Sequence, residues 1–268
     1  MPHAAHLLHH AVDGPEDAPL LVLGPSLGTS TAVWEPHLDR LSGEFRTLRF
    51  DLPGHGGSSA AAVPDPRVGR TTMADLARLV LDLAELHGHR AFHYAGISIG
   101  GAIGAQLAVH HPERVNSLAL VSSAAYFGGF ERWHERSVLV RREGTAPLLD
   151  AAPGRWFGDP ATARTPHGAS LLQTLVHADP VGYSACCDAL ATFDLRAELG
   201  RVTAPTLVVA GSRDTATPAG AAAELAGGIP TASLVTIDSG HLPSADEAPA
   251  LTSRLYEHLT TVKGADGV

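Results

Sequence analysis

The segment with the clearest capacity for chemistry is Gly96-Ile97-Ser98-Ile99-Gly100, in which a serine stands between two glycines. It follows an apolar run and precedes a stretch of small residues that favours a closely packed helix. A G-x-S-x-G sequence between a strand and a helix indicates a sharp turn that raises the serine hydroxyl above a sheet. The helix that begins there offers N–H groups and positive dipole character to developing negative charge. Ser98 is therefore the candidate nucleophile, and the N–H of Ile99 is a candidate donor to an oxyanion.

A serine hydroxyl is a weak nucleophile that needs a neighbouring base, and the base needs a third group to fix its tautomer. Two later apolar runs lead to residues of the required types: residues 206–210 lead to Asp214, and residues 233–237 lead to His241. Parallel strands bring their carboxyl ends to one edge of a sheet, so both residues are expected to lie near Ser98. The sequence thus predicts a catalytic triad of Ser98, Asp214 and His241.

Other residues compete for these roles. Asp238 and, more weakly, Asp194 are alternatives for the acid, but Asp238 stands too close to the end of its own strand to reach beneath the histidine. His55 and His93 are alternatives for the base, although neither follows a late strand. A tight turn capped by a serine would explain the glycines, but it would leave the matching acid and histidine unexplained.

The elements that must position these residues follow from an alternation of short apolar runs and amphipathic stretches. Strands are predicted at 18–23, 45–50, 91–95, 115–121, 206–210 and 233–237, and helices at 31–41, 71–86, 219–226 and 248–262, with a further helix of small residues that follows the serine turn and ends at about 110. Alternating strands and helices predict an α/β fold with a mostly parallel sheet covered by helices on both faces.

The alternation of predicted strands and helices stops between residues 124 and 195. No strand is predicted there, and the segment contains tryptophans and paired arginines. This segment is interpreted as a helical cap inserted over the site. Residues 1–123 and 196–268 then form the core domain. A chain of 268 residues fits one such domain with a modest insertion.

Composition excludes several classes of function. The formal net charge of −9 argues against binding to nucleic acid or to an anionic membrane, because the long-range field has the wrong sign. The same field means that an anionic substrate would need a local positive group. Cys186 and Cys187 are adjacent, which disfavours a disulfide between them, and no Cys/His cluster has zinc spacing. We therefore expect no metal and no cofactor.

The first residues lack the charged and apolar regions of a signal peptide, and no run approaches the roughly 20 apolar residues that span a bilayer. A cytoplasmic protein is expected. The sequence leaves the oligomeric state open.

Beyond these patterns, the chain resembles the α/β-hydrolase superfamily over nearly its whole length, and within it the 3-oxoadipate enol-lactonases (β-ketoadipate enol-lactone hydrolases). The resemblance is carried by residues 26–29 followed by Trp34, the loop at 49–58, Trp133 with Arg136, Arg155-Trp156-Phe157, and residues 179–190, 194–196 and 214–218. The chain departs from the lactonases at Pro25, at Ile99 and at residues 242–246. These departures spare the triad and bear on the identity of the substrate.

The resemblance implies an α/β-hydrolase fold with a helical cap and a small lactone or ester substrate that carries a carboxylate. Leu27, by its position before Trp34, would supply the second N–H of the oxyanion hole. Arg136 would bind the carboxylate, Trp133 would form an apolar wall, and Ser26 would also contact the substrate. Other lactonases, esterases and perhydrolases, including biosynthetic ones, share the triad, and the fold also serves as a small-molecule receptor with a vestigial triad.

Overall fold

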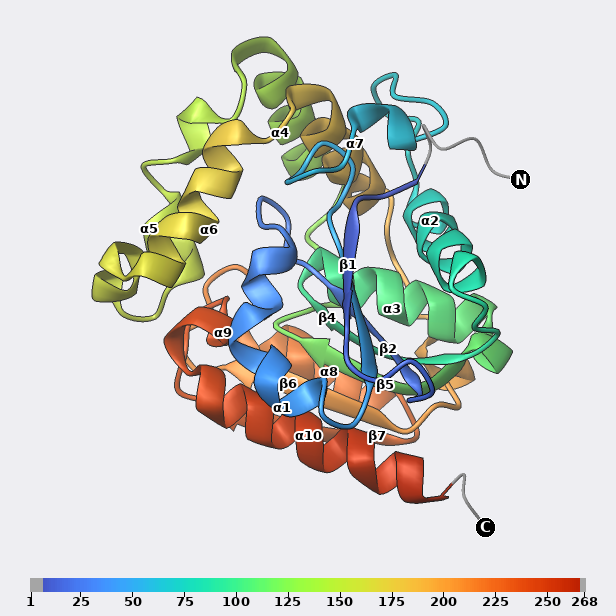
Figure 1. Cartoon of the computed structure of the whole chain (residues 1–268). Helices are drawn as coiled ribbons and strands as arrows, with labels where there is room; N and C mark the ends of the chain where they lie inside the picture. Colours follow the sequence, from blue (N-terminus) through green and yellow to red (C-terminus); the bar gives the residue numbers. More distant parts are fainter. Residues whose placement is uncertain (1–6, 266–268) are drawn as a thin grey trace.

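In the part of the chain that the structure describes, seven strands form a single sheet in the order β1-β3-β2-β4-β5-β6-β7 (Figure 1). The computed structural model describes residues 7–265. The strands are β1 His10–Asp13, β2 Leu20–Gly24, β3 Arg46–Phe50, β4 Phe92–Ile97, β5 Val115–Val121, β6 Thr206–Gly211 and β7 Ala232–Ile237. Only the edge pair β1–β3 is antiparallel, and the other neighbours run parallel.

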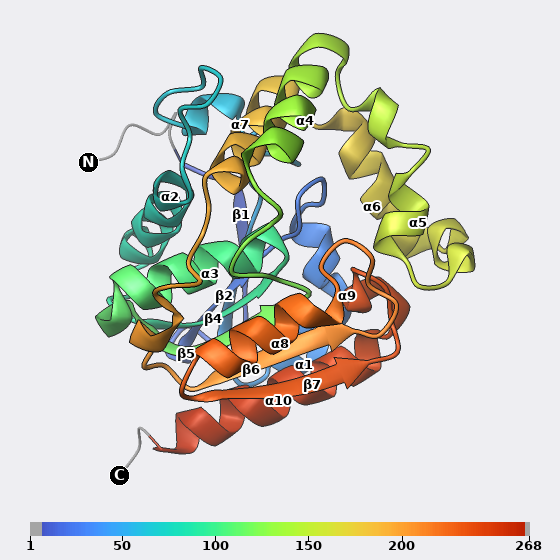
Figure 2. The ribbon, with the colours of Figure 1, turned by 180° about the vertical axis from the view of Figure 1, so that it is seen from behind.

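The central strands are apolar on both faces because helices cover both sides of the sheet. Every residue of β2, β4 and β6 is buried. On one face, α3 (Ile99–His110) packs on β2, β4 and β5 beside α2 (Met73–Leu86), and α8 (Ala219–Gly228) packs on β6 and β7. On the other face lie α1 (Leu38–Leu41) and α10 (Ala248–Ala265), which contact each other (Figures 1 and 2). The predicted fold class is confirmed.

The segment between β5 and β6 contains helices and no strand among its residues, all of which are described. Its helices are α4 (Phe130–Glu143), α5 (Ala152–Trp156), α6 (Pro166–His177) and α7 (Pro180–Ala191). α4 packs along α7, and the group lies over one edge of the sheet, as both views show (Figures 1 and 2). Cys186 and Cys187 are buried, free thiols within α7.

The structure differs from the sequence prediction in two places. Residues 31–41 form a 3-10 helix, Thr31–His37, which contains Pro36 and passes directly into α1. Proline lacks the N–H that an α-helix would use at this position. The edge strand β1 was not predicted, because its four residues are only partly buried and form no apolar run. Within residues 7–265, no helix is both long and apolar enough to cross a membrane.

The close approach of α3 to β4 depends on Gly104. A Cβ atom built at this position would lie 2.5 Å from Cδ1 of the Tyr94 ring. Tyr94 is fully buried and donates a hydrogen bond from its hydroxyl to the carbonyl oxygen of Gly100 at 2.8 Å, so its ring has little room to move.

Gly104→Ala is therefore expected to lower the free energy of unfolding by about 1–3 kcal/mol, the usual cost of overpacking. The matched control is Gly220→Ala in α8, where nothing lies within 4 Å of the added methyl group. The control should gain up to about 1 kcal/mol from helix propensity. Urea unfolding measures both values, and a stabilised Gly104→Ala protein would contradict the packing described here.

Candidate active site

Ser98 occupies a strained turn between β4 and α3. Its backbone has φ 57° and ψ −118°, a conformation that residues other than glycine rarely adopt. The surroundings hold it there: the Ser98 N–H donates to the carbonyl of Val121 at 2.9 Å, and its carbonyl accepts from the Ser123 hydroxyl at 2.8 Å. The turn is thus fixed by β5 as well as by its own helix.

The glycines on either side of Ser98 leave space for backbone alone. A Cβ on Gly96 would lie 2.3 Å from the carbonyl carbon and oxygen of Gly100, and a Cβ on Gly100 would lie 2.5 Å from the carbonyl oxygen of Gly24. Three segments of backbone therefore meet beneath the serine. This close approach explains the G-x-S-x-G pattern in physical terms.

His241 follows β7 and forms a hydrogen bond with Asp214, which follows β6. The distance between His241 Nδ1 and Asp214 Oδ2 is 2.9 Å, and the two side chains are 5% and 0% exposed. Because a carboxylate only accepts, Nδ1 carries the proton and Nε2 is left free to accept one. The imidazole is thereby held in the tautomer that a general base requires.

Asp214 is surrounded by donors. Its Oδ1 accepts from the backbone N–H groups of Ala216 and Thr217 at 2.7 and 2.9 Å, and its Oδ2 lies 2.6 Å from the Thr217 hydroxyl. Burial opposes ionisation of this carboxyl, but the hydrogen bonds from His241 and Thr217 outweigh burial and lower its pKa below the usual range. Asp214 is therefore ionised at neutral pH and holds the imidazole electrostatically.

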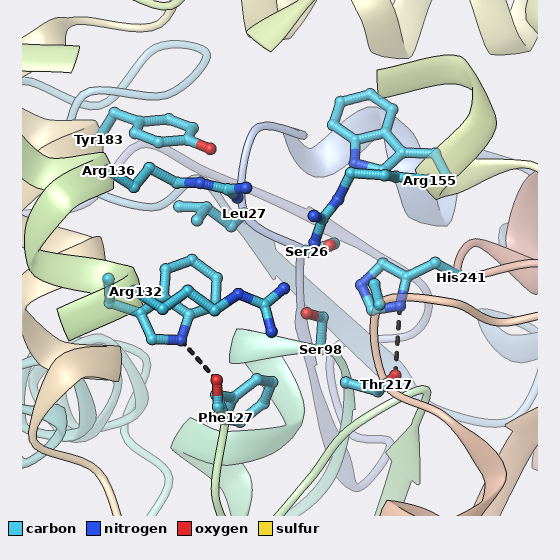
Figure 3. A pocket seen from close by; sticks show the side chains of 13 residues that line it. Ser26, Leu27, Ser98, Phe127, Arg132, Arg136, Arg155, Tyr183, Thr217 and His241 are labelled. Carbon is cyan, nitrogen blue, oxygen red and sulfur yellow. Dashed lines mark hydrogen bonds between the residues drawn. The ribbon is translucent and has the colours of Figure 1, made fainter. Parts of the chain in front are cut away.

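Ser98 and His241 line the same cavity. Within the described part of the chain, no hydrogen bond joins them, and in Figure 3 the Ser98 hydroxyl is turned toward the side of the cavity that holds Arg132. Such a bond is commonly long or absent in unliganded hydrolases and forms when the substrate binds. Rotation about the Cα–Cβ bond of Ser98 redirects the hydroxyl without moving the backbone.

Of the expected oxyanion donors, Leu27 lines the cavity together with Ser98, and Ile99 is the first residue of α3, directly after Ser98. In the described residues neither backbone N–H is engaged in a hydrogen bond. The Leu27 loop is held by its neighbour Gly28, whose N–H donates to His55 Nε2 at 3.0 Å. His55 in turn has Nδ1 2.9 Å from the Pro53 carbonyl, and burial lowers the pKa of its ring, so it remains neutral and accepts.

The other competing residues lie outside the cavity. Asp238 has an exposed side chain that pairs with Arg213, 3.0 Å from its Nε, and Asp194 pairs with Arg196 at 2.6 Å. His93 is buried inside β4 against the Ser117 hydroxyl at 2.8 Å. Among the candidate bases, only His241 is hydrogen-bonded to a buried acid and lines the same cavity as Ser98.

The cavity lies between the sheet and the cap, and part of it is open to solvent. Its lining includes the three residues expected to bind substrate: Ser26, Trp133 and Arg136. Two further arginines, Arg132 and Arg155, also line it (Figure 3). The sequence contained a signal for Arg132, because it stands four residues before Arg136 and thus on the same helix face.

Among the described residues, none of these three arginines forms an ion pair with an acid. The guanidinium groups of Arg132 and Arg136 lie against the Trp133 indole, 5.5 and 5.1 Å from its centre. Burial, and then repulsion by Arg136, lower the pKa of Arg132, and burial followed by repulsion from Arg136 and Arg132 does the same to Arg155. The cavity is therefore strongly positive within a protein of net negative charge.

A hydrogen-bond clamp joins the cap to the loop that carries His241. Asp246 accepts from the N–H groups of Gly240 and Gly158 at 2.8 and 2.7 Å and from the Thr162 hydroxyl at 2.8 Å. The Leu242 N–H also donates to the carbonyl of Trp156 at 2.9 Å.

In residues 7–265, no group of three or more His, Cys, Asp or Glu side chains is arranged to hold a metal ion.

Residues 19–151 match the model of the alpha/beta hydrolase fold family, and residues 181–265 match that of TAP-like proteins. The chain is 31% identical to 3-oxoadipate enol-lactonase 2 of Acinetobacter baylyi, over 91% of this chain and 89% of that protein. A crystal structure of the enol-lactonase from Burkholderia xenovorans superimposes with a TM-score of 0.89 at 36% identity, covering 94% of this chain and 96% of that one. The expected resemblance to enol-lactonases is confirmed.

The relatives do not all share one substrate. A pimeloyl-[acyl-carrier protein] methyl ester esterase of Chromobacterium violaceum is 30% identical over 91% of this chain and 95% of that protein. Similarity of this degree thus extends to hydrolases of lactones and of open-chain esters.

Thr217 holds Asp214 in place through hydrogen bonds from its backbone N–H and its hydroxyl, and replacing Thr217 tests the contribution of the hydroxyl. Thr217→Val keeps the shape and removes the hydroxyl 2.6 Å from Asp214 Oδ2. We expect kcat/KM on p-nitrophenyl acetate to fall about tenfold, equivalent to about 1.4 kcal/mol, because a hydrogen bond to a charged group is lost. Thr215→Val, at an exposed position in the same loop, is the control and should retain activity. Full activity in Thr217→Val would show that the hydroxyl does not support the acid.

Proposed function

Because this chain belongs to the alpha/beta hydrolase fold family, we propose that it is a serine hydrolase that cleaves a carboxylic ester or a lactone through an acyl-enzyme on Ser98. The observation that carries the proposal is the buried hydrogen bond between His241 and Asp214 on the cavity that Ser98 also lines. An activated serine requires a base in a fixed tautomer, and this pair provides one.

In the first step His241 Nε2 takes the Ser98 proton while Oγ attacks the substrate carbonyl. The N–H groups of Leu27 and Ile99 stabilise the oxyanion, a contribution that typically amounts to about 10²–10³ in rate for each donor. The leaving oxygen receives its proton from His241. Water, activated by the same imidazole, then hydrolyses the acyl-enzyme and releases the acid. No metal or cofactor is needed for this sequence.

We propose 3-oxoadipate enol-lactone as the substrate and 3-oxoadipate as the product, which would place the protein in the β-ketoadipate route of aromatic catabolism in the cytoplasm. The similarity to enol-lactonases supports this choice. So does the positive cavity, because this lactone carries one carboxylate, which Arg136 can bind through two parallel hydrogen bonds. The ring oxygen leaves as an enolate, a better leaving group than an alkoxide, so the chemistry makes modest demands on the site.

A second candidate is another lactonase, an esterase or a perhydrolase, including a biosynthetic one, and the similarity to a methyl ester esterase favours it. The same triad would serve, and only the fit of the cavity would differ. A small-molecule receptor with a vestigial triad is the remaining alternative. The intact hydrogen bonds of Asp214 argue against it.

Covalent labelling separates an enzyme from a receptor. A fluorophosphonate should modify Ser98 within minutes, and Asp214→Asn should slow labelling by several orders of magnitude, since loss of the orienting acid costs about 10⁴ in a serine protease. Mass spectrometry of the labelled peptide identifies the modified residue. Folded wild-type protein that remains unlabelled would point to a receptor and contradict the proposed hydrolase.

Arg136 should determine the preference for an anionic substrate. We expect Arg136→Met to lower the ratio of kcat/KM for the enol-lactone to kcat/KM for p-nitrophenyl acetate by about 10- to 100-fold, the value of a charged hydrogen bond. Arg142→Met is the matched control, since Arg142 lies on the same helix with its side chain 70% exposed and paired with Glu143. If kcat/KM fell equally for both substrates, Arg136 would support the fold or the reaction of any ester and would not select for a carboxylate.

A further inference from the structure

The cavity contains more positive charge than a substrate with one carboxylate can neutralise. Arg132, Arg136 and Arg155 contribute three positive charges, no Asp or Glu is among the residues that line the cavity, and Asp214 behind His241 contributes one negative charge. Three positive charges and one negative charge leave an excess of two. Arg136 repels Arg132 and Arg155, and an anion placed among the three guanidinium groups would relieve this repulsion. Two anionic groups would balance this charge.

The three arginines are not equivalent in position. Figure 3 shows the Arg132 side chain extending toward Ser98, whose hydroxyl is turned toward the Arg132 guanidinium. Arg136, one helical turn further along α4, points into another part of the same cavity near the Tyr183 ring, and Arg155 enters from α5. In this view Arg132 points toward Ser98, Arg136 lies near Tyr183, and Arg155 extends toward Ser26.

The chemistry of the proposed reaction supplies a second anion beside Ser98. A lactone with one carboxylate enters as a monoanion, and its ring C–O bond breaks when Ser98 attacks the carbonyl. Water then adds to the acyl carbon and the bond to Ser98 Oγ breaks, which yields a carboxylic acid that loses its proton at neutral pH. The net change is lactone plus water to a dicarboxylate plus one proton. The new carboxylate forms at the atom that was bonded to Ser98.

We propose that Arg132 forms a second carboxylate subsite beside Ser98, so that the cavity binds a linear dicarboxylate at both ends, with Arg136 and Arg155 at one end and Arg132 at the other. This inference rests on the proposed function for the origin of the second carboxylate. It assigns Arg132 to the product-bound state, in which its charge is neutralised. A linear dicarboxylate of about the product's length should therefore bind better than the corresponding monocarboxylate.

Binding to a protein that cannot turn over tests the subsite directly. Ser98→Ala removes the nucleophile, and isothermal titration with adipate and with hexanoate compares two and one carboxylates on the same six-carbon chain. We expect adipate to bind at least tenfold more tightly than hexanoate. Adding Arg132→Met should abolish most of that difference, whereas adding Arg142→Met, on the exposed face of the same helix, should preserve it.

Two outcomes would overturn the subsite: equal affinities of Ser98→Ala for adipate and hexanoate, or an Arg132→Met substitution that weakens both ligands by the same factor. The second result would assign Arg132 to packing on Trp133 or to general attraction of anions. Failure of the subsite is distinguishable from failure of the proposed function. Fluorophosphonate labelling of Ser98 without a preference for adipate would remove only the subsite, and a preference for adipate without labelling would remove only the hydrolase.

Discussion

The hydrogen bond between His241 and Asp214 is the interaction on which the site depends. It joins the loops after β7 and β6, it leaves Nε2 of the imidazole free, and it is shielded from water on both sides. Its strength comes from the ionised state of Asp214, which four donor groups maintain against the cost of burial. In the proposed hydrolase, Ser98 would lack an activating base without this bond.

Asp246 connects the cap to the loop that carries His241. Its carboxylate binds the N–H groups of Gly158 in the cap and Gly240 in the loop before His241. Displacement of the cap would therefore disturb His241 as well as the arginines. The charged groups are divided between the core and the cap. The core contributes Asp214 and His241, and the cap contributes every arginine that lines the cavity. A negatively charged protein thus presents a positive pocket to an anion.

The sequence predicted much of this arrangement because the catalytic candidates follow apolar strands directly. The run at 115–121 became β5 with the same limits, and Ser98, Asp214 and His241 stand just after β4, β6 and β7. Strand β1 could not be found in this way, because its stability comes from pairing with β3 and hardly from an apolar pattern of its own.

The contents of the cavity were harder to predict than its position. Arg132 reaches the cavity because α4 is rotated so that Trp133, Ser137 and Val140 are buried, and this rotation is set by packing on α7. The role of His55 depends on two loops that meet only in the folded chain. Contacts between segments far apart in sequence decide both features, and no local pattern encodes them.

Activation of Ser98 by His241 can be tested with a crystal structure of the protein in which a tetrahedral phosphonate is bound to Ser98. We expect His241 Nε2 to lie about 2.6–3.2 Å from the Ser98 Oγ or from the phosphonate oxygen that replaces the leaving group. We also expect Nδ1 to remain bonded to Asp214. An imidazole that stays out of reach of both oxygens, with the adduct fully formed, would show that His241 does not activate Ser98.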